Sequence, residues 1–459
     1  MRLISTSTLE FCEFFDRDIP EYYGILSHRW GSDEATFQDF EKGVQEEREG
    51  FKKIKDFCNL ASTYDLEWVW VDTCCIDKRS SAELTEAINS MYTWYQRACQ
   101  CYVHLSDVLW EEGTSELSQT TLDRIRKSNW FTRGWTLQEL LAPRDVYFFD
   151  HNWRFIGSKD DLVQEISEIT GIDTMYLLPR PAKIPNKEEY GPCTKAPDCR
   201  NHHPRIKFAV TGRWEPSVAT RMSWVAKRRT TRIEDLAYCM LGIFDVNMPL
   251  LYGEGRKAFR RLQHEIIKQS DDDSIFAWTA DQHTTGILAY WPTNFANSRN
   301  VLERAPHRTH RSPYAITNQG LQLPITWRCW DPVKVHHLRE VRILLDCGMC
   351  GPQGFKNIML RLETLNGRDW NRSCSYQIET MDDGPWYQPQ ASSTGDVKQY
   401  LLTPSITPSQ SKTMFGRKQE DARIPTGSMT AIRELMVMAD WLYGPSPPGK
   451  IYDPLIRKT

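Results

Sequence analysis

The sequence predicts an α/β protein whose first domain is built on a mostly parallel sheet. In the first 150 residues, short apolar runs typical of buried strands alternate with longer segments whose apolar residues recur at helical spacing. A helix between two strands provides the crossover that a parallel pair requires. The chain has 459 residues, which is too long for one ordinary core. We therefore expect further parts after this α/β domain.

Four strands and three helices are expected in the α/β domain, which we place at residues 1–155. The strands are residues 23–27, 68–71, 101–105 and 146–149. The helices are residues 51–64, 82–98 and 135–141, and in the first of them Phe51, Ile54 and Phe57 share one face. Each apolar strand is followed by polar residues, which mark the point where it ends.

Three further parts are expected after residue 155. Residues 156–272 form a helical extension with a polar, proline-rich insertion at 179–216. Within it, Thr231 and Glu234 have the spacing of a capping box, which predicts a helix to about residue 244. Residues 273–384 contain short β-type runs, including 274–278 and 286–290, and are expected to form a β-rich domain. Residues 385–459 are expected to be mostly irregular, with room for one helix at 428–443.

Composition and charge exclude several classes of protein. A hydrophobic content of 40% and a charged content of 25% are those of a folded protein rather than a disordered one. The formal net charge of −3 argues against a nucleic-acid or membrane-surface partner. No apolar run is long enough to span a bilayer, and the N-terminus does not resemble a signal peptide. The thirteen scattered cysteines suit reduced thiols, so a cytoplasmic location is expected.

Polar side chains at the strand ends are the first candidates for a site. His28, Arg29 and Trp30 follow the first strand, and Asp72 follows the second. Ligands of open α/β sheets bind beyond the carboxyl ends of the strands. Arg29 can pair with a diphosphate, and His28 can titrate near neutral pH. Asp72 can hold a ribose hydroxyl or orient His28. For each residue a purely structural role, such as bracing the loop or forming a turn, is the alternative.

A second candidate lies on the helix predicted at 135–141. Trp135 and Glu139 are four residues apart and therefore share a helix face. The indole can stack on a flat base, while the carboxylate can stabilise an oxocarbenium-like transition state. Arg133 precedes this helix and can balance Glu139 or a phosphate. The alternative is a helix whose Trp packs on the sheet while its Glu is a solvated or capping charge.

Two cysteine-containing patterns are candidates for chemical sites. Cys74 and Cys75 raise the possibility of a thiolate nucleophile with His28 as its base, although buried core cysteines are the commoner explanation. A second pattern, in the polar insertion, offers soft ligands for zinc at a spacing that no standard finger has, so no metal is predicted there. Its members are Cys193, Cys199, His202 and His203.

Three stretches together resemble the fungal HET (heterokaryon incompatibility) domain. They are the sequences YGILSHRWG at 23–31, WVDTCCIDK at 70–78 and RGWTLQELL at 133–141. Residues 222–255 resemble the segment that often follows this domain in vegetative incompatibility proteins. The resemblance implies a distant relationship to the TIR domain and thus a flavodoxin-like sheet. NAD-cleaving TIR domains use a Glu in a Trp-x-x-x-Glu pattern, so the resemblance implies a catalytic role for Glu139.

The resemblance leads to two hypotheses about function. The first is an effector of fungal incompatibility, innate immunity and programmed cell death that acts as an NAD⁺ glycohydrolase, with NAD as substrate rather than cofactor. The second is a non-catalytic signalling module that self-associates and recognises a partner protein. The resemblance implies self-association in both cases. The direction of the Glu139 side chain distinguishes them. A catalytic carboxylate must face the edge of the sheet near His28 and Arg29, whereas a side chain that points into the core, or into solvent away from that edge, favours the signalling module.

Overall fold

The computed structural model describes residues 1–111, 117–178, 215–280 and 286–303, and seven shorter stretches. These are 313–317, 320–325, 340–351, 354–364, 370–372, 379–382 and 398–402. The chain divides into two compact units. The first comprises Met1–Glu189 and Arg221–Glu265, and the second comprises Tyr190–Thr220 and Ile266–Thr459.

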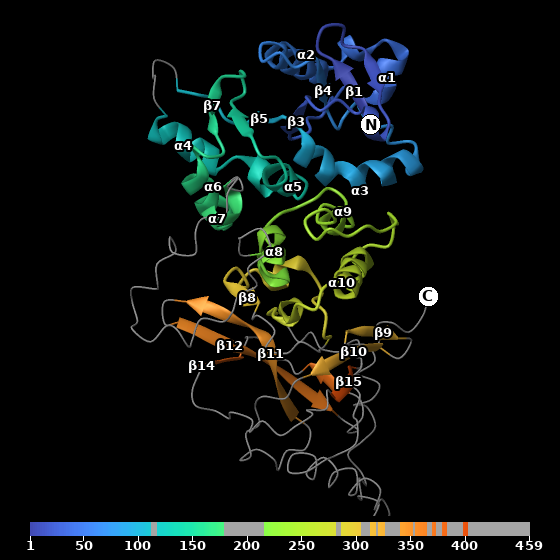
Figure 1. Cartoon of the computed structure of the whole chain (residues 1–459). Coiled ribbons are helices and arrows are strands. Elements are labelled where there is room, and N and C mark those ends of the chain that lie inside the picture. The colour runs from blue at the N-terminus through green and yellow to red at the C-terminus, as the bar shows by residue number, and fades with distance from the viewer. Residues whose placement is uncertain are drawn as a thin grey trace, which may run out of the picture. The chain divides into compact units, whose positions relative to one another are not determined.

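The first unit is built on a seven-stranded sheet with the order β2-β1-β4-β3-β5-β6-β7, coloured blue to green in Figure 1. Its four central strands are parallel to one another. They are β3 (Gly24–His28), β4 (Trp68–Trp70), β5 (Gln100–His104) and β6 (Val146–Phe149). The antiparallel strands at the edges are β1 (Arg2–Ser5), β2 (Phe11–Glu13) and β7 (Phe155–Ser158).

The order of the central strands determines where a ligand can bind. The strand that comes first in the chain, β3, lies between β4 and β5, so the chain moves outward from β3 in both directions. Open α/β sheets bind ligands where the order reverses in this way, outside the carboxyl ends of the strands. In this unit that point is the carboxyl end of β3 and β5, where His28 and His104 are register partners. The predicted mostly parallel α/β sheet is thus confirmed for the central strands.

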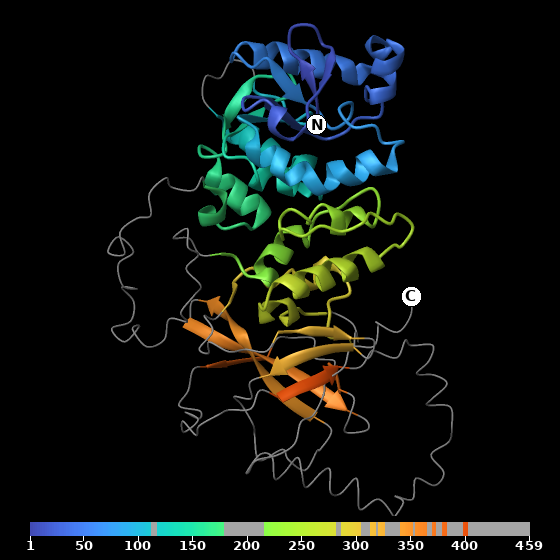
Figure 2. The ribbon, with the colours of Figure 1, turned by 45° about the vertical axis from the view of Figure 1, so that its right-hand side comes forward.

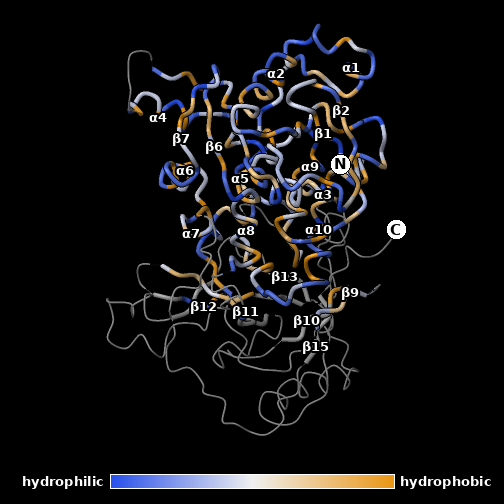
Figure 3. The backbone as a smooth tube through the Cα atoms, turned by 45° about the horizontal axis from the view of Figure 1, so that its top comes forward, coloured by the Kyte–Doolittle hydropathy of each residue, from blue (hydrophilic) through white to orange (hydrophobic). Residues whose placement is uncertain are grey.

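Helices cover both faces of this sheet (Figures 1 and 2). On one face lies α2 (Glu49–Ser62), whose Phe57 packs edge-on against Tyr102 of β5. On the other face lie α3 (Ser81–Arg97) and α5 (Thr136–Leu141), and Tyr95 of α3 donates a hydrogen bond to the carbonyl of Leu26. Hydrophobic and hydrophilic residues alternate along α2 (Figure 3), as in a helix with one buried face.

Four shorter helices complete the part of this unit before residue 178. They are α1 (Phe37–Lys42), α4 (Gln119–Arg126), α6 (Val163–Thr170) and α7 (Thr174–Leu177). Helix α1 begins with a capping box between Thr36 and Asp39 and ends at Gly43, whose φ of 68° is the left-handed conformation that glycine adopts most readily. Among the described residues, no helix is both long and apolar enough to cross a bilayer.

Residues 221–265 pack on the α/β core as part of the same unit. They contain most of α8 (Val218–Val225), all of α9 (Asp235–Tyr238) and most of α10 (Lys257–Gln269). Backbone hydrogen bonds join Arg229 to Thr132 and Gly134. The predicted capping box is wrong. Helix α9 begins after Glu234, whose carboxylate instead accepts hydrogen bonds from the backbone of Gly253 and Gly255.

The second unit contains an eight-stranded sheet that is mainly antiparallel. Its order is β8-β11-β12-β13-β15-β10-β9, with β14 paired to β12. The longest strands are β11 (Glu340–Gly351) and β12 (Gly354–Thr364). The others are β8 (Val301–Glu303), β9 (Ala315–Thr317), β10 (Gly320–Ile325), β13 (Trp370–Arg372), β14 (Glu379–Asp382) and β15 (Lys398–Leu402).

Two runs predicted as strands in this unit are not strands. Residues Asp273–Phe276 form a 3₁₀ helix, because the Asp272 carboxylate caps its start by accepting a hydrogen bond from the backbone of Ser274. Around residues 286–290, the carbonyl of Ile287 accepts a hydrogen bond from the indole of Trp278 rather than from a neighbouring strand. A short apolar run does not distinguish a strand from a buried turn. The expected insertion at 179–216 falls almost wholly outside the described residues, as does the helix at 428–443.

Candidate functional site

Glu139 lies at the carboxyl end of β3. Its Oε2 accepts a hydrogen bond of 2.5 Å from Ser27 Oγ, and Ser27 Oγ in turn accepts one of 2.9 Å from the indole of Trp130. An indole can only donate, so the direction of the bond from Trp130 to Ser27 is determined. The glutamate side chain therefore points to the strand residue next to His28, at the edge where the strand order reverses.

The environment of Glu139 favours its neutral form. The residue is 5% exposed. Burial, with a contribution from the negative charge of Asp72, raises the pKa of Glu139 to about 8. The hydrogen bond from Ser27 and the positive charges of Arg228 and Arg133 act in the opposite direction. At pH 7 roughly one tenth of such a carboxyl group is ionised.

Asp72 connects this carboxyl group to the residues after β3. Its Oδ2 accepts a hydrogen bond of 2.8 Å from the indole of Trp30, and its Oδ1 lies 3.7 Å from Nε2 of His28. The ammonium group of Lys78 lies 3.6 Å from the centre of the Trp30 ring, within the range of a cation–π interaction. Burial also raises the pKa of Asp72. Asp72 therefore faces both parts of the candidate site.

His28 is buried without a hydrogen bond. Its side chain is 0% exposed, and neither ring nitrogen has a hydrogen-bond partner. Burial, together with the positive charge of Lys53, holds the pKa of His28 well below its usual value. Because side chains alternate along a strand, Ser27 and His28 point to opposite faces of the sheet. His28 thus lies on the α2 face, whereas Ser27 and Glu139 lie on the α5 face.

His104, the register partner of His28, provides a test of this buried edge. Burial lowers the pKa of His104 to about 4, although Nε2 lies 3.1 Å from the carbonyl of His151. Below pH 6.5 the unfolded chain binds a proton that folded His104 does not, so stability falls as the pH falls. His104→Gln should remove about 2 kcal/mol of this loss at pH 5. The measurement is urea unfolding of wild type and His104→Gln between pH 7 and 5. If the free energy of unfolding fell equally with pH in both proteins, this prediction would be wrong.

The other predicted site residues are Arg29, Arg133 and Trp135. Arg29 is exposed at the end of β3, and within the described part of the chain it has no ion pair. The Arg133 guanidinium donates hydrogen bonds of 3.3 Å to Thr231 Oγ1. Trp135 hydrogen-bonds to Asp235. The structure therefore brings His28, Trp30 and Asp72 together, and it places Glu139 against Ser27 on the opposite face of the sheet from His28. It directs Arg133 and Trp135 toward residues 221–265.

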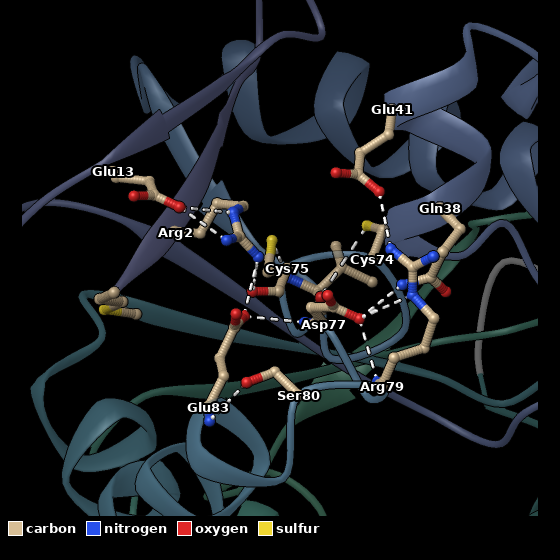
Figure 4. A network of polar contacts seen from close by, with 12 residues as sticks. Arg2, Glu13, Gln38, Glu41, Cys74, Cys75, Asp77, Arg79, Ser80 and Glu83 are labelled. Atoms are coloured by element: carbon tan, nitrogen blue, oxygen red, sulfur yellow. Dashed lines mark hydrogen bonds and ion pairs between the residues drawn. The ribbon is translucent and has the colours of Figure 1, made fainter.

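A network of ion pairs holds the loop that carries Asp72 and Lys78 (Figure 4). Arg2 pairs with Glu83 at 2.8 Å and with Glu13 at 2.6 Å, and it also donates to the carbonyl of Cys75. On the far side of the loop, Asp77 accepts a hydrogen bond of 2.6 Å from Gln38. The loop is thus tied to β1, β2, α1 and α3.

The cysteines next to Asp72 do not have the properties of a nucleophile. Cys74 is 0% and Cys75 is 3% exposed. Burial raises the pKa of Cys74 well above that of a free thiol, so the thiolate is scarce. The described residues contain no group of three His, Cys, Asp or Glu side chains that could hold a metal ion. Cys193, Cys199, His202 and His203 lie outside the described residues.

Sequence reasoning missed Ser27, Trp130, Lys78 and Arg228. Ser27 and Lys78 lie inside two of the three stretches that resemble the HET domain, but a serine in a strand and a lysine in a loop are too common to stand out. Trp130 and Arg228 lie 103 and 92 residues from the side chains that they contact, Ser27 and Thr136. No local pattern signals contacts over such separations.

Parts of this chain are similar to known proteins. Residues 23–121 match the family model "Heterokaryon incompatibility protein (HET)", and residues 257–320 match "Domain of unknown function (DUF8212)". Over 258 residues the chain is 39% identical to "Vegetative incompatibility protein HET-E-1" of Podospora anserina. That alignment covers 56% of this chain and 16% of the length of the relative. No solved structure is significantly similar to the chain.

The matched region contains β3, β4 and β5, with His28 at the end of β3, and the loops that carry Trp30 and Asp72. Glu139 lies just beyond it, on the helix that packs against the carboxyl end of β3. Residues 23–121 therefore resemble the heterokaryon incompatibility (HET) domain.

Proposed function

We propose that this protein is an effector of fungal heterokaryon incompatibility whose HET domain cleaves NAD⁺ into nicotinamide and ADP-ribose. The relative named for vegetative incompatibility supports the biological setting. The single observation that supports the chemistry is the buried Glu139, hydrogen-bonded to Ser27 at the point where the strand order reverses. The strand order 2-1-3-4 of the central sheet is also that of flavodoxin-like folds, and is consistent with a TIR-like domain.

The reaction requires little from the protein beyond charge and position. The bond between the ribose C1 and the nicotinamide nitrogen breaks, and its electron pair leaves with the nicotinamide. Water then adds to C1 and a proton is released. Positive charge develops on the ribose in the transition state, where a carboxylate at Glu139 would stabilise it. Asp72 is a second acidic group in reach of ribose hydroxyls.

The protonation state of Glu139 makes the proposal specific. Only the ionised carboxylate stabilises a cation, and a pKa of about 8 leaves this form in the minority at pH 7. The activity kcat/KM for NAD⁺ should therefore rise with pH to a midpoint near 8, because this ratio reports groups of the free enzyme. A profile that is flat between pH 6 and 9 would contradict a role for ionised Glu139.

The deciding experiment is NAD⁺ cleavage by the 459-residue protein at concentrations high enough to promote self-association. Glu139→Gln should reduce turnover roughly 100-fold, since the amide keeps the shape of the side chain but carries no charge. Glu168→Gln is the matched control: this glutamate is 70% exposed on α6, and its substitution should leave turnover unchanged. Equal turnover by wild type and Glu139→Gln, or none by either, would remove the enzymatic proposal.

The second candidate is a non-catalytic module that self-associates and recognises a partner protein. The burial and neutrality of Glu139 favour it, since a neutral carboxyl group hydrogen-bonded to Ser27 can serve structure alone. Expression in a fungal host separates the two. Toxicity that survives Glu139→Gln supports the module, whereas toxicity that disappears together with NAD⁺ loss supports the enzyme.

A further inference from the structure

Arg228 is a buried arginine that contacts the start of α5, the helix that carries Glu139. It is 6% exposed, and it comes from the segment that follows the long insertion. Its Nη1 donates a hydrogen bond of 2.8 Å to the carbonyl of Arg133 and one of 2.9 Å to Thr136 Oγ1. Its Nε donates a bond of 3.3 Å to the carbonyl of Trp224. The guanidinium therefore joins the residues before α5 and its first turn to α8.

The backbone reinforces this junction. The amide of Arg229 donates to the carbonyl of Thr132 at 2.7 Å, and the amide of Gly134 donates to the carbonyl of Arg229 at 2.9 Å. Trp135 hydrogen-bonds to Asp235 of α9. Residues 132–136 are thus held from several directions by residues 224–235, within the first unit.

The hydrogen bonds at this junction do not by themselves explain why the side chain is charged. Its Nη2 is buried and makes no hydrogen bond. Burying a cation with an unpaired nitrogen is unfavourable, and a neutral side chain of the same shape would avoid this. Thr136 and Glu139 lie three residues apart and share a face of α5, so the charge of Arg228 acts on the side of the helix that carries the glutamate.

We infer that Arg228 is a positioning residue for Glu139: it holds the start of α5 so that the carboxyl group lies against Ser27, and its charge favours the ionised carboxylate. This inference rests on the functional role proposed above for Glu139. It implies that the segment after the insertion is part of the working HET domain, although the matched family model ends at residue 121. A protein that ended before residue 221 would lack this contact.

Several other groups near Glu139 also affect the protonation of its carboxyl group. Asp72 comes from the loop after β4, and Arg133 precedes α5. Three weakly acidic side chains also interact with Glu139, and burial, together with the charge of this glutamate, raises their pKa and keeps them neutral. They are Tyr95 of α3, Cys101 of β5 and Cys239 after α9. Arg228 and Arg133 are the positive charges that favour the carboxylate, and Arg228 is the buried one of the two.

The test measures the protonation of Glu139 directly in the 459-residue protein. Carbon-13 NMR of glutamate-labelled protein follows the carboxyl carbon, and the Glu139→Gln spectrum assigns it. Arg228→Met should shift the midpoint upward by about one pH unit, because an opposite charge is lost. Arg229→Met is the matched control, since the neighbouring arginine is exposed and contributes only its backbone to the junction. A midpoint that stays within a few tenths of a unit in folded Arg228→Met would overturn the inference.

Arg228→Lys covers the case in which the methionine variant does not fold. It keeps the charge but cannot reproduce the fork of hydrogen bonds. The Glu139 midpoint should stay near that of wild type, while the amides of the first turn of α5 exchange hydrogen at least tenfold faster. Unchanged exchange would overturn the clamping role. None of these measurements uses NAD⁺, so they stand even if the enzymatic proposal fails; if it holds, the midpoint of kcat/KM in Arg228→Met moves upward as well.

Discussion

Glu139→Gln should raise the free energy of unfolding at pH 7 by about 3 kcal/mol. The pKa of this carboxyl group is about 8 in the folded protein and near 4.5 in the unfolded chain. Between these values the folded protein binds a proton that the unfolded chain has released, so wild-type stability falls as pH rises from about 4.5 to 8. Glutamine does not titrate, and its carbonyl can accept the hydrogen bond from Ser27.

The pH dependence separates this effect from better packing. The gain should vanish near pH 4.5 and reach its maximum above pH 8. Urea unfolding read by hydrogen exchange of peptides from β3 to β6 reports the first unit alone. Glu168→Gln, on the exposed face of α6, serves as the control and should change stability little. A gain of the same size at pH 5 and pH 8 would show that titration of Glu139 is not its cause.

Gly242→Ala should destabilise the first unit by about 3 kcal/mol. A Cβ at Gly242 would lie 2.0 Å from Cβ and 2.4 Å from Cγ of Tyr92, which belongs to α3. Both distances join atoms near the backbone, so rotation of the tyrosine ring does not relieve them. The chain must separate α3 from the segment that contains Gly242, and this opens the packing of residues 221–265 on the core.

The control for this substitution is Gly351→Ala. A Cβ at Gly351, at the end of β11, would have no atom within 4 Å, so stability should change by a few tenths of a kcal/mol. At 25 °C, amides of α3 and α9 should exchange hydrogen faster in Gly242→Ala than in wild type. In Gly351→Ala their exchange should be unchanged. If both variants were equally stable, the close contact between α3 and residue 242 would be wrong.

The central strands could be predicted because each is an apolar run closed by polar residues. β3, β4, β5 and β6 are almost entirely buried, and burial on both faces requires continuous apolar sequence. β2 and β7 lie at the edges of the sheet, are three and four residues long, and are only partly buried, so they have little local signal. The capping box at Thr231 failed because Glu234 binds the backbone of a loop some twenty residues later.

For the candidate site, local chemistry identified the residues but not their arrangement. His28, Trp30, Asp72 and Glu139 were chosen for their position at strand ends or on a helix face, and the structure brings them to one edge of the sheet. That Ser27 and His28 point to opposite faces follows from the period of a strand, but which helix covers each face does not. The separation of Trp135 from Glu139 depends on Asp235, a hundred residues away along the chain.

Amino-acid order thus suffices for the central strands and for the resemblance to the HET domain, because hydrophobic periodicity and short motifs are local properties. The neutral state of Glu139, the unpaired nitrogens of His28 and the clamp by Arg228 follow only from the folded chain. Each depends on burial and on charges contributed by residues distant in the chain. Removal from water and long-range Coulomb interactions exist only once those residues are packed together.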